Sequence, residues 1–272
     1  MKKIYLFLLY IVTTAFLFIP VKTLSYEPCD TVRSCIGNAL TLTVTQGKGA
    51  HYVDVEKTKS MNKLRDSMTI EFWMKPERQA GKTQFIAGLW GPGEDKNDVW
   101  VLYFSPDDYL VFELNGEKTN LKKSDNTIVR ISASQLYNRW SHIAAVFDGK
   151  RAMAYIYLNG IKTDSATNNL YPLTKLRVQQ EDKLPLQIGS CNGLSDNSNN
   201  RTFKGQIDEF RIWARIFSDF EIYCNRLKSF EGNEQGLILY YRFNEVPNNY
   251  TLCDATPNRN TGKARSGASC QK

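Results

Sequence analysis

The sequence predicts an all-β fold in which two antiparallel sheets pack as a jelly-roll sandwich, with one short helix. Short segments that alternate apolar and polar residues recur along the chain, and residues typical of turns separate them. No regular alternation of strands with long helices is present, so a parallel α/β fold is not indicated. The length suits one such sandwich.

The most informative segment is a strand followed at once by a capped helix. Alternation predicts a strand over Gly205–Trp213, with Ile207 and Phe210 on opposite faces. Ser218 and Glu221 then have the spacing of a capping box, and large apolar residues recur after them at helical spacing. This transition predicts the single short helix directly after the strand.

The other strands are predicted from alternation between turns. In chain order they cover residues 39–45, 51–55, 68–75, 84–90, 99–104, 109–114, 140–147, 152–158, 184–189 and 236–243. The Asp148-Gly149 pair predicts a tight hairpin between two of them. Residues 190–201 are almost entirely small and polar, which predicts a loop.

The N-terminus has the pattern of a secretory signal peptide. Lys2 and Lys3 precede an apolar run and then small residues, so residues 1–25 are predicted to be removed. The alternative is an anchoring transmembrane helix. Polar residues follow the run at once, which favours the signal peptide. The mature protein is then a secreted, extracellular chain that does not span a membrane. We expect a single domain over 26–272, with a lead-in (26–38) and a C-terminal extension (246–272).

The charge balance excludes some partners. The formal net charge is +7, and removal of residues 1–25 takes away three lysines and no acid, leaving (35 − 3) − 28 = +4. This mild excess gives no case for nucleic acid and argues only weakly for polyanions such as sulphated glycans.

Six cysteines follow the signal segment, which predicts three disulfides in an extracellular protein. Fifteen connectivities are possible. Proximity in the chain favours Cys29–Cys35 and Cys253–Cys270, which leaves Cys191–Cys224. No pair has the Cys-x-x-Cys spacing of a zinc or thioredoxin-type site.

Seven motifs in a fixed order carry a resemblance to a known family. They are Tyr-Val-Asp-Val at 52–55, Thr-Ile-Glu-Phe-Trp-Met at 69–74, the segment 140–149 ending in Phe-Asp-Gly, Tyr-Leu-Asn-Gly at 157–160, Leu-Gln-Ile-Gly at 186–189, Gly-Gln-Ile-Asp-Glu-Phe-Arg-Ile-Trp at 205–213, and Leu-Tyr-Tyr-Arg-Phe-Asn-Glu at 239–245. Together they resemble the laminin G-like, pentraxin-like jelly roll of the concanavalin A-like lectin and glucanase superfamily, from about residue 38 to 245. Residues 254–262 resemble the Asp-rich turn that usually opens such domains. Here this turn either closes the sandwich against the first strand or is the remnant of a second unit.

The resemblance implies either sugar binding or glycan hydrolysis, and the residues favour binding. Glucanases of this superfamily carry Glu-x-Asp-x-(x)-Glu on one strand, because alternation points those carboxylates into one cleft. This motif is absent, so no catalytic residue is predicted. Pentraxin-like members bind calcium through acids after the glycine that matches Gly189. Here only Asp196 follows it closely, with Asp208 as a second candidate ligand. The alternative for Asp208 is to accept hydrogen bonds from nearby backbone amides.

Aromatic residues and rim loops are the candidate ligand surface. Tyr155 and Tyr157 share one face of their strand, and Trp100 and Tyr103 are expected near them. Aromatic side chains are candidates because sugar rings stack on aromatic faces. The alternative is that these aromatics cover the second sheet or the helix. The rim-loop candidates are Asn192 and Asp196.

Asn200 and Asn249 begin glycosylation sequons. We therefore expect a secreted, disulfide-stabilised, non-catalytic lectin or cell-adhesion module that recognises a glycan or an extracellular protein. Calcium is a possible cofactor, and an oligomer is compatible with the resemblance. The alternatives are a structural subunit of an extracellular complex that binds no sugar and, less favoured, a glycoside hydrolase.

Overall fold

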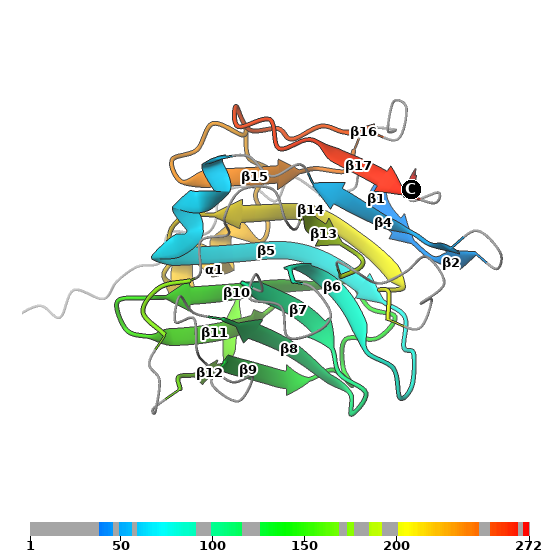
Figure 1. Ribbon diagram of the computed structural model, residues 1–272, viewed down its shortest axis with the longest axis horizontal. Coiled ribbons are helices and arrows are strands. Elements are labelled where there is room, and N and C mark those ends of the chain that lie inside the picture. Colours follow the sequence, from blue (N-terminus) through cyan, green and yellow to red (C-terminus); the bar gives the residue numbers. More distant parts are fainter. Residues whose placement is uncertain are drawn as a thin grey trace, which may run out of the picture. The chain divides into compact units, whose positions relative to one another are not determined.

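Two eight-stranded antiparallel sheets form the fold, and the predicted all-β sandwich is confirmed (Figure 1). The computed structural model describes residues 38–45, 49–55, 59–90, 99–115, 126–168, 173–176, 185–191, 201–244, 251–265 and 269–271. These residues all belong to one compact unit, Val32–Lys272. The predicted boundary at residue 25 lies outside them.

The first sheet contains, in spatial order, β12 (Ile161–Ala166), β11 (Met153–Leu158), β10 (Ser141–Asp148), β5 (Ser67–Pro76), β14 (Gly205–Trp213), β1 (Ala39–Leu42) and β18 (Ser269–Gln271), and β15 (Leu237–Tyr241) also pairs with β14. The second sheet contains β16 (Thr251–Leu252), β17 (Gly262–Arg265), β4 (Tyr52–Val55), β13 (Leu186–Ile188), β6 (Gln84–Leu89), β7 (Trp100–Phe104), β8 (Tyr109–Leu114) and β9 (Thr127–Ser132). A small hairpin joins β2 (Val44–Thr45) and β3 (Gly49–Ala50), and the helices are η1 (Lys59–Arg65) and α1 (Asp219–Asn225).

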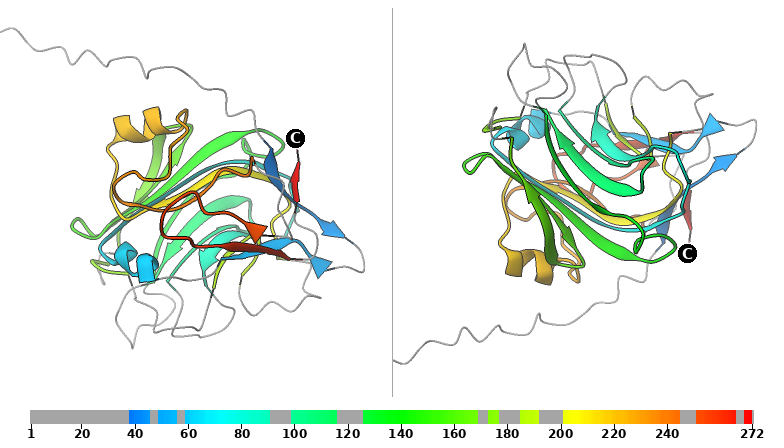
Figure 2. Two further views of the ribbon diagram at one scale, coloured as in Figure 1. Left: turned by 90° about the horizontal axis from the view of Figure 1, so that it is seen from above. Right: turned by 90° about the horizontal axis from the view of Figure 1, so that it is seen from below.

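The core lies between the two sheets, and strand alternation supplies it. Along β5, Met68, Ile70, Phe72 and Met74 are fully buried in the main apolar cluster. The residues between them point to the outer face of the first sheet, the face that α1 and a smaller apolar cluster cover. Figure 2 shows the two layers with α1 on the outer side of the first.

The predicted alternation of β14 fails at one point. Ile207, Phe210 and Ile212 all pack in the core, although the sequence predicts opposite faces for Ile207 and Phe210. The cause is a β-bulge between Asp208 and Arg211, where Glu209 has a φ of 53°. An extra residue in a strand reverses the side-chain phase beyond it. The bulge also marks the point where one edge of β14 changes partner from β1 to β15.

The predicted helix is present, and its N-terminus is capped as predicted. The Ser218 side chain accepts a hydrogen bond from the backbone N–H of Glu221, and the Glu221 carboxylate accepts one from the backbone N–H of Ser218. Tyr157 from β11 and Lys162 from β12 both contact Asp219 in the first turn, at 2.7 Å and 2.9 Å. These contacts place α1 over the β11–β12 end of the first sheet.

The Asp-rich turn closes the sandwich. The Asp254 carboxylate accepts hydrogen bonds from the backbone N–H groups of Tyr240, Thr256 and Asn260. The strand that follows, β17, then pairs with β4 in the second sheet. The sequence suggested pairing with the first strand as one alternative. The structure shows a different partner, because β1 pairs with β18 instead.

Two of the predicted disulfides are wrong. Cys191 is a buried thiol, and its Sγ donates a 3.1 Å hydrogen bond to the Trp90 carbonyl oxygen. Cys191 packs on the outer face of the second sheet, whereas α1 carries the disulfide-bonded Cys224 on the outer face of the first. The whole sandwich separates the two cysteines.

The Cys253–Cys270 prediction fails for a similar reason. Cys253 is an exposed free thiol next to β16 in the second sheet, whereas Cys270 lies on β18 in the first. Cys29–Cys35 lies outside the described residues, as do the sequon residues Asn200 and Asn249. In the described part of the chain, no helix is long and apolar enough to cross a bilayer.

Candidate functional site

The structure places the predicted ligand aromatics where most of them cannot meet a ligand. Trp100 is 0% exposed, inside the core between the sheets. Tyr157 is 2% exposed beneath α1, with its hydroxyl donating to Asp219 at 2.7 Å. Tyr155 is half-buried, and Lys162 Nζ lies 5.0 Å from its ring centroid. The alternative that these aromatics support the helix is thus correct for Tyr157, and the prediction for Trp100 is wrong.

Of the two predicted calcium ligands, Asp196 and Asp208, the structure describes only Asp208. Asn192 and Asp196 lie outside the described residues. Asp208 is buried at the β14 bulge, where its Oδ1 accepts a 2.9 Å hydrogen bond from the Glu209 backbone N–H, the capping role considered above. Burial, with the neighbouring Glu209, raises the pKa of Asp208 to about 7. Within the ranges that the structure covers, no three His, Cys, Asp or Glu side chains are close enough to share a metal ion.

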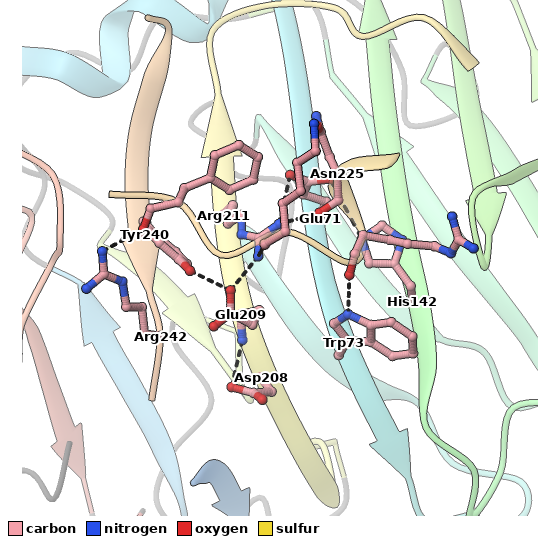
Figure 3. Close-up of polar contacts among 12 residues, drawn as sticks. Glu71, Trp73, His142, Asp208, Glu209, Arg211, Asn225, Tyr240 and Arg242 are labelled. Atoms are coloured by element: carbon pink, nitrogen blue, oxygen red, sulfur yellow. Dashed lines mark hydrogen bonds and ion pairs between the residues drawn. The ribbon is translucent and has the colours of Figure 1, made fainter. Parts of the chain in front are cut away.

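A buried ionic cluster, which no local sequence signal predicts, lies on the outer face of the first sheet (Figure 3). Arg211 from β14 forms ion pairs with Glu209 and, at 3.4 Å, with Glu71 from β5. Trp213 Nε1 donates to Glu71 at 3.0 Å, and the Tyr240 hydroxyl donates to Glu209. Burial raises the pKa of Glu71, and the Arg211 charge opposes that rise.

The same cluster holds down the chain after β14. Arg211 donates to the carbonyl oxygens of Asn225 and Lys228, at 3.0 Å and 2.6 Å. Trp73 Nε1 donates to the Arg226 carbonyl oxygen at 2.8 Å (Figure 3). The last carbonyl groups of α1 are therefore paired to the sheet, which fixes the helix in position.

These acids cannot act as a hydrolytic pair. Glu71 is 0% exposed, Glu209 and Arg211 are also buried, and the guanidinium lies between the two carboxylates. A substrate cannot reach them, and each carboxylate is ion-paired with the same Arg211 guanidinium. His142, which is 3.7 Å from Glu71, is neutral, because burial and then the Arg211 and Arg226 charges hold its pKa well below the usual range. The cluster is therefore structural.

The outer face of the second sheet carries two half-buried aromatic rings, while the polar side chains beside them are largely buried: Glu113 is 4% and Gln187 is 7% exposed. The half-buried rings of Phe85 (β6) and Tyr103 (β7) lie side by side there, with centroids 5.9 Å apart. Both pack against a small apolar cluster that contains Trp90 and Val101. The Tyr103 hydroxyl donates to Glu113 at 3.1 Å. We call Phe85, Tyr103 and the cross-strand row of residues that ends at Glu113 the second-sheet surface.

A row of residues in register crosses this surface from strand to strand. Asp54, Gln187, Gly88, Val101 and Glu113 are successive cross-strand neighbours on β4, β13, β6, β7 and β8. At the centre, a Cβ on Gly88 would meet the Trp100 carbonyl oxygen at 2.8 Å, so only glycine fits, and the row is lowest there.

Two polar groups of the row are fixed by their neighbours. Gln187 Nε2 donates to Asp54 at 2.8 Å, while its buried Oε1 has no hydrogen-bond partner among the described residues. The Glu113 carboxylate also accepts a 2.7 Å hydrogen bond from Asn126. The surface thus combines two neighbouring, mutually tilted aromatic rings with oriented polar groups, the combination that suits a sugar.

The two carboxylates of this row are too far apart for glycoside hydrolysis. Asp54 and Glu113 are separated by four strand spacings. At about 4.8 Å each, this is roughly 19 Å. Paired catalytic carboxylates in glycosidases stand about 5–9.5 Å apart. The surface can therefore bind a sugar, but it does not present this catalytic pair.

Comparisons with known proteins agree with the fold. A sequence profile of the concanavalin A-like lectin/glucanases superfamily matches residues 47–223. A "putative carbohydrate binding protein" from Bacteroides ovatus superposes with a TM-score of 0.62 at 20% identity, over 84% of this chain and 58% of that one. The NanB sialidase of Streptococcus pneumoniae gives 0.51 at 18% identity, over 69% of this chain and 27% of that one. The chain thus spans under two thirds of either protein. No curated protein sequence matches it.

Proposed function

Because the chain belongs to the concanavalin A-like lectin/glucanases superfamily, we propose that it is a secreted, non-catalytic module that binds glycans through the second-sheet surface. The observation that carries the proposal is the half-buried Phe85–Tyr103 pair, with Tyr103 hydrogen-bonded to Glu113 on an otherwise rigid sheet. The apolar face of a pyranose ring can stack on such rings, while its hydroxyl groups need donors and acceptors held in place.

Several observations support the separate parts of this proposal. Secretion is supported by the signal-like pattern of residues 1–25. A non-catalytic role is supported by the burial of Glu71 and Glu209 and by the wide separation of Asp54 and Glu113. Sugar as the ligand class is supported by the description of the similar Bacteroides ovatus protein.

A glycan array, run with and without a chelator, tests the proposal. We expect binding to at least one glycan, and a loss of about fivefold when Phe85 is replaced by alanine, because stacking on an aromatic ring contributes roughly 1 kcal/mol. Tyr109→Phe is the matched control, since Tyr109 lies on the neighbouring strand and Arg130 covers its ring at 4.5 Å.

The possible results separate the alternatives. Binding that the Phe85→Ala variant retains in full would overturn the assignment of the surface. No detectable binding to any glycan on the array would reject sugar binding and favour a structural subunit with a protein partner. Loss of binding in chelator would show that a metal ion, calcium in the first instance, takes part.

A further inference from the structure

The outer face of the first sheet exposes large apolar side chains at one end. Five large hydrophobic residues are exposed among the described ones, and three of them are aromatic side chains on α1 or directly before β10: Trp140, Phe220 and Tyr223. Trp140 is 42% exposed and Tyr223 is 45% exposed. Exposed large aromatics that gather on one face indicate a contact surface rather than chance exposure.

Backbone contacts bring the tip of β11 to α1. Gly160, in the turn after β11, lies directly against Tyr223, because a Cβ on Gly160 would meet the Tyr223 Cα at 2.8 Å. Asn159, in the same turn, exchanges hydrogen bonds with the backbone of His142 near the start of β10. Trp140 directly precedes β10, so it lies at this same end of the sheet.

Unpaired cations surround these aromatics. The Arg226 guanidinium lies 3.6 Å from the centroid of the Tyr223 ring. Arg139 directly precedes Trp140 in the chain. Met74 of β5 pairs with Ser141, and the next residue of β5, Lys75, is on the outer face of the sheet. In the part of the chain that the structure describes, these three cations form no ion pair, whereas Arg78, Lys162 and Lys204 each do.

The framework under this surface is rigid. Trp73 holds the Arg226 carbonyl oxygen, and the buried ionic cluster holds the chain on either side of it. Side chains fixed in this way lose little conformational freedom when a ligand binds, so more of the contact energy appears as affinity.

We propose that Trp140, Tyr223, Arg226, Arg139 and Lys75 form a basic-aromatic surface that binds an acidic saccharide, one that carries carboxylate or sulphate groups. A sugar ring stacks on the exposed Trp140 side chain. Its acidic groups pair with the Lys75 ammonium, the Arg139 guanidinium and those Arg226 N–H groups that do not donate to the Tyr223 carbonyl oxygen. The inference extends the proposed function to a second surface on the opposite sheet.

An acidic protein segment fits these residues less well. The centre of a protein interface is depleted of charged residues and rich in joined apolar contacts. Here Arg226 stacks on Tyr223, and Lys75 and Trp140 directly flank the Met74–Ser141 pair of the sheet, so a cation accompanies each aromatic side chain. That pairing matches a saccharide in which each ring carries one acidic group.

Calorimetric titration of the full chain with oligogalacturonate, a heparin-derived oligosaccharide, a neutral malto-oligosaccharide and polyglutamate tests the inference. We expect at least one acidic saccharide to bind, with affinity that falls as salt rises. Trp140→Ala and Arg226→Gln should each weaken that binding about tenfold. Lys150→Gln, at the hairpin between β10 and β11 at the opposite end of the sheet, is the matched control and should not weaken it.

Each other result would overturn the inference. These are no binding of either acidic saccharide, equal losses in the Lys150→Gln control, or polyglutamate bound more tightly than both saccharides. The urea midpoint of each variant is measured alongside, and the Arg226→Gln result decides if Trp140→Ala does not fold. The second-sheet surface is scored separately, through Phe85→Ala on the glycan array. Failure of one surface therefore leaves the other result interpretable.

Discussion

Replacement of Arg211 by methionine should strongly destabilise the protein. The substitution keeps much of the side-chain volume but leaves Glu71 and Glu209 buried without a cation, and it removes two hydrogen bonds to the chain around α1. Removal of one partner from a buried ionic group costs about 3–5 kcal/mol. For a domain of this size, that corresponds to a fall in Tm of roughly 6–20 °C.

The assay is equilibrium unfolding in urea, followed by tryptophan fluorescence, at two pH values. Burial already raises the pKa of Glu71 in the folded state, and loss of the Arg211 charge should raise it further. A carboxyl with a raised folded pKa takes up a proton on folding, so its unfavourable contribution grows as pH rises above its unfolded value. The free energy of unfolding that Arg211→Met loses relative to wild type should thus be largest at neutral pH and shrink toward about pH 4.

Matched variants make this result decisive. Arg215→Met breaks an ion pair with Glu221 in which both side chains are about two-fifths exposed, and it should cost no more than about 1 kcal/mol. The triple variant Glu71→Gln, Glu209→Gln, Arg211→Met removes the unbalanced charges and should recover part of the loss. A cost for Arg211→Met no larger than for Arg215→Met would refute the role of the cluster.

Two further predictions concern single polar groups. Asp208→Asn keeps an acceptor for the Glu209 N–H but removes a carboxyl whose pKa is about 7. The wild type should lose stability relative to this variant as pH rises from about 4 to about 7, because the folded state binds that proton more tightly than the unfolded state. Urea unfolding at pH 5 and pH 8 checks this, and the same free-energy difference between the two proteins at both pH values would contradict it. Tyr157→Phe loses the hydrogen bond to Asp219 and should lower the free energy of unfolding by about 1 kcal/mol without changing glycan affinity, and a selective loss of affinity would restore Tyr157 as a ligand residue.

Local patterns predicted the elements in which neighbouring residues carry the signal. The β5 strand, the β10–β11 hairpin through Asp148-Gly149 and the Ser218–Glu221 cap all depend on residues within a few positions of each other. The edge strands β9 and β12 were missed, although Thr127–Ser132 alternates buried and exposed residues. In the sequence this alternation is visible only from Val129 to Ser132, because Thr127 is polar but buried and Ile128 is apolar but exposed.

The functional geometry depends instead on contacts between distant parts of the chain. Glu71 and Arg211 are 140 residues apart, and only the pairing of β5 with β14 brings them together. The bulge at Asp208 reverses the phase of β14 without any glycine or proline to announce it. The outward-facing tyrosines of β11 were placed on the correct face, but the sequence alone could not show that α1 covers Tyr157.

The pairing of the first and last strands has a consequence for synthesis. β18 pairs with β1 in one sheet and β17 pairs with β4 in the other, so both layers are completed only after all the preceding described strands have been synthesised. Until then, β1 and β4 each expose an unpaired edge that can template association with another nascent chain. A stop codon ahead of residue 262 would leave both edges open at once, so even a short truncation should give aggregates rather than a smaller soluble domain.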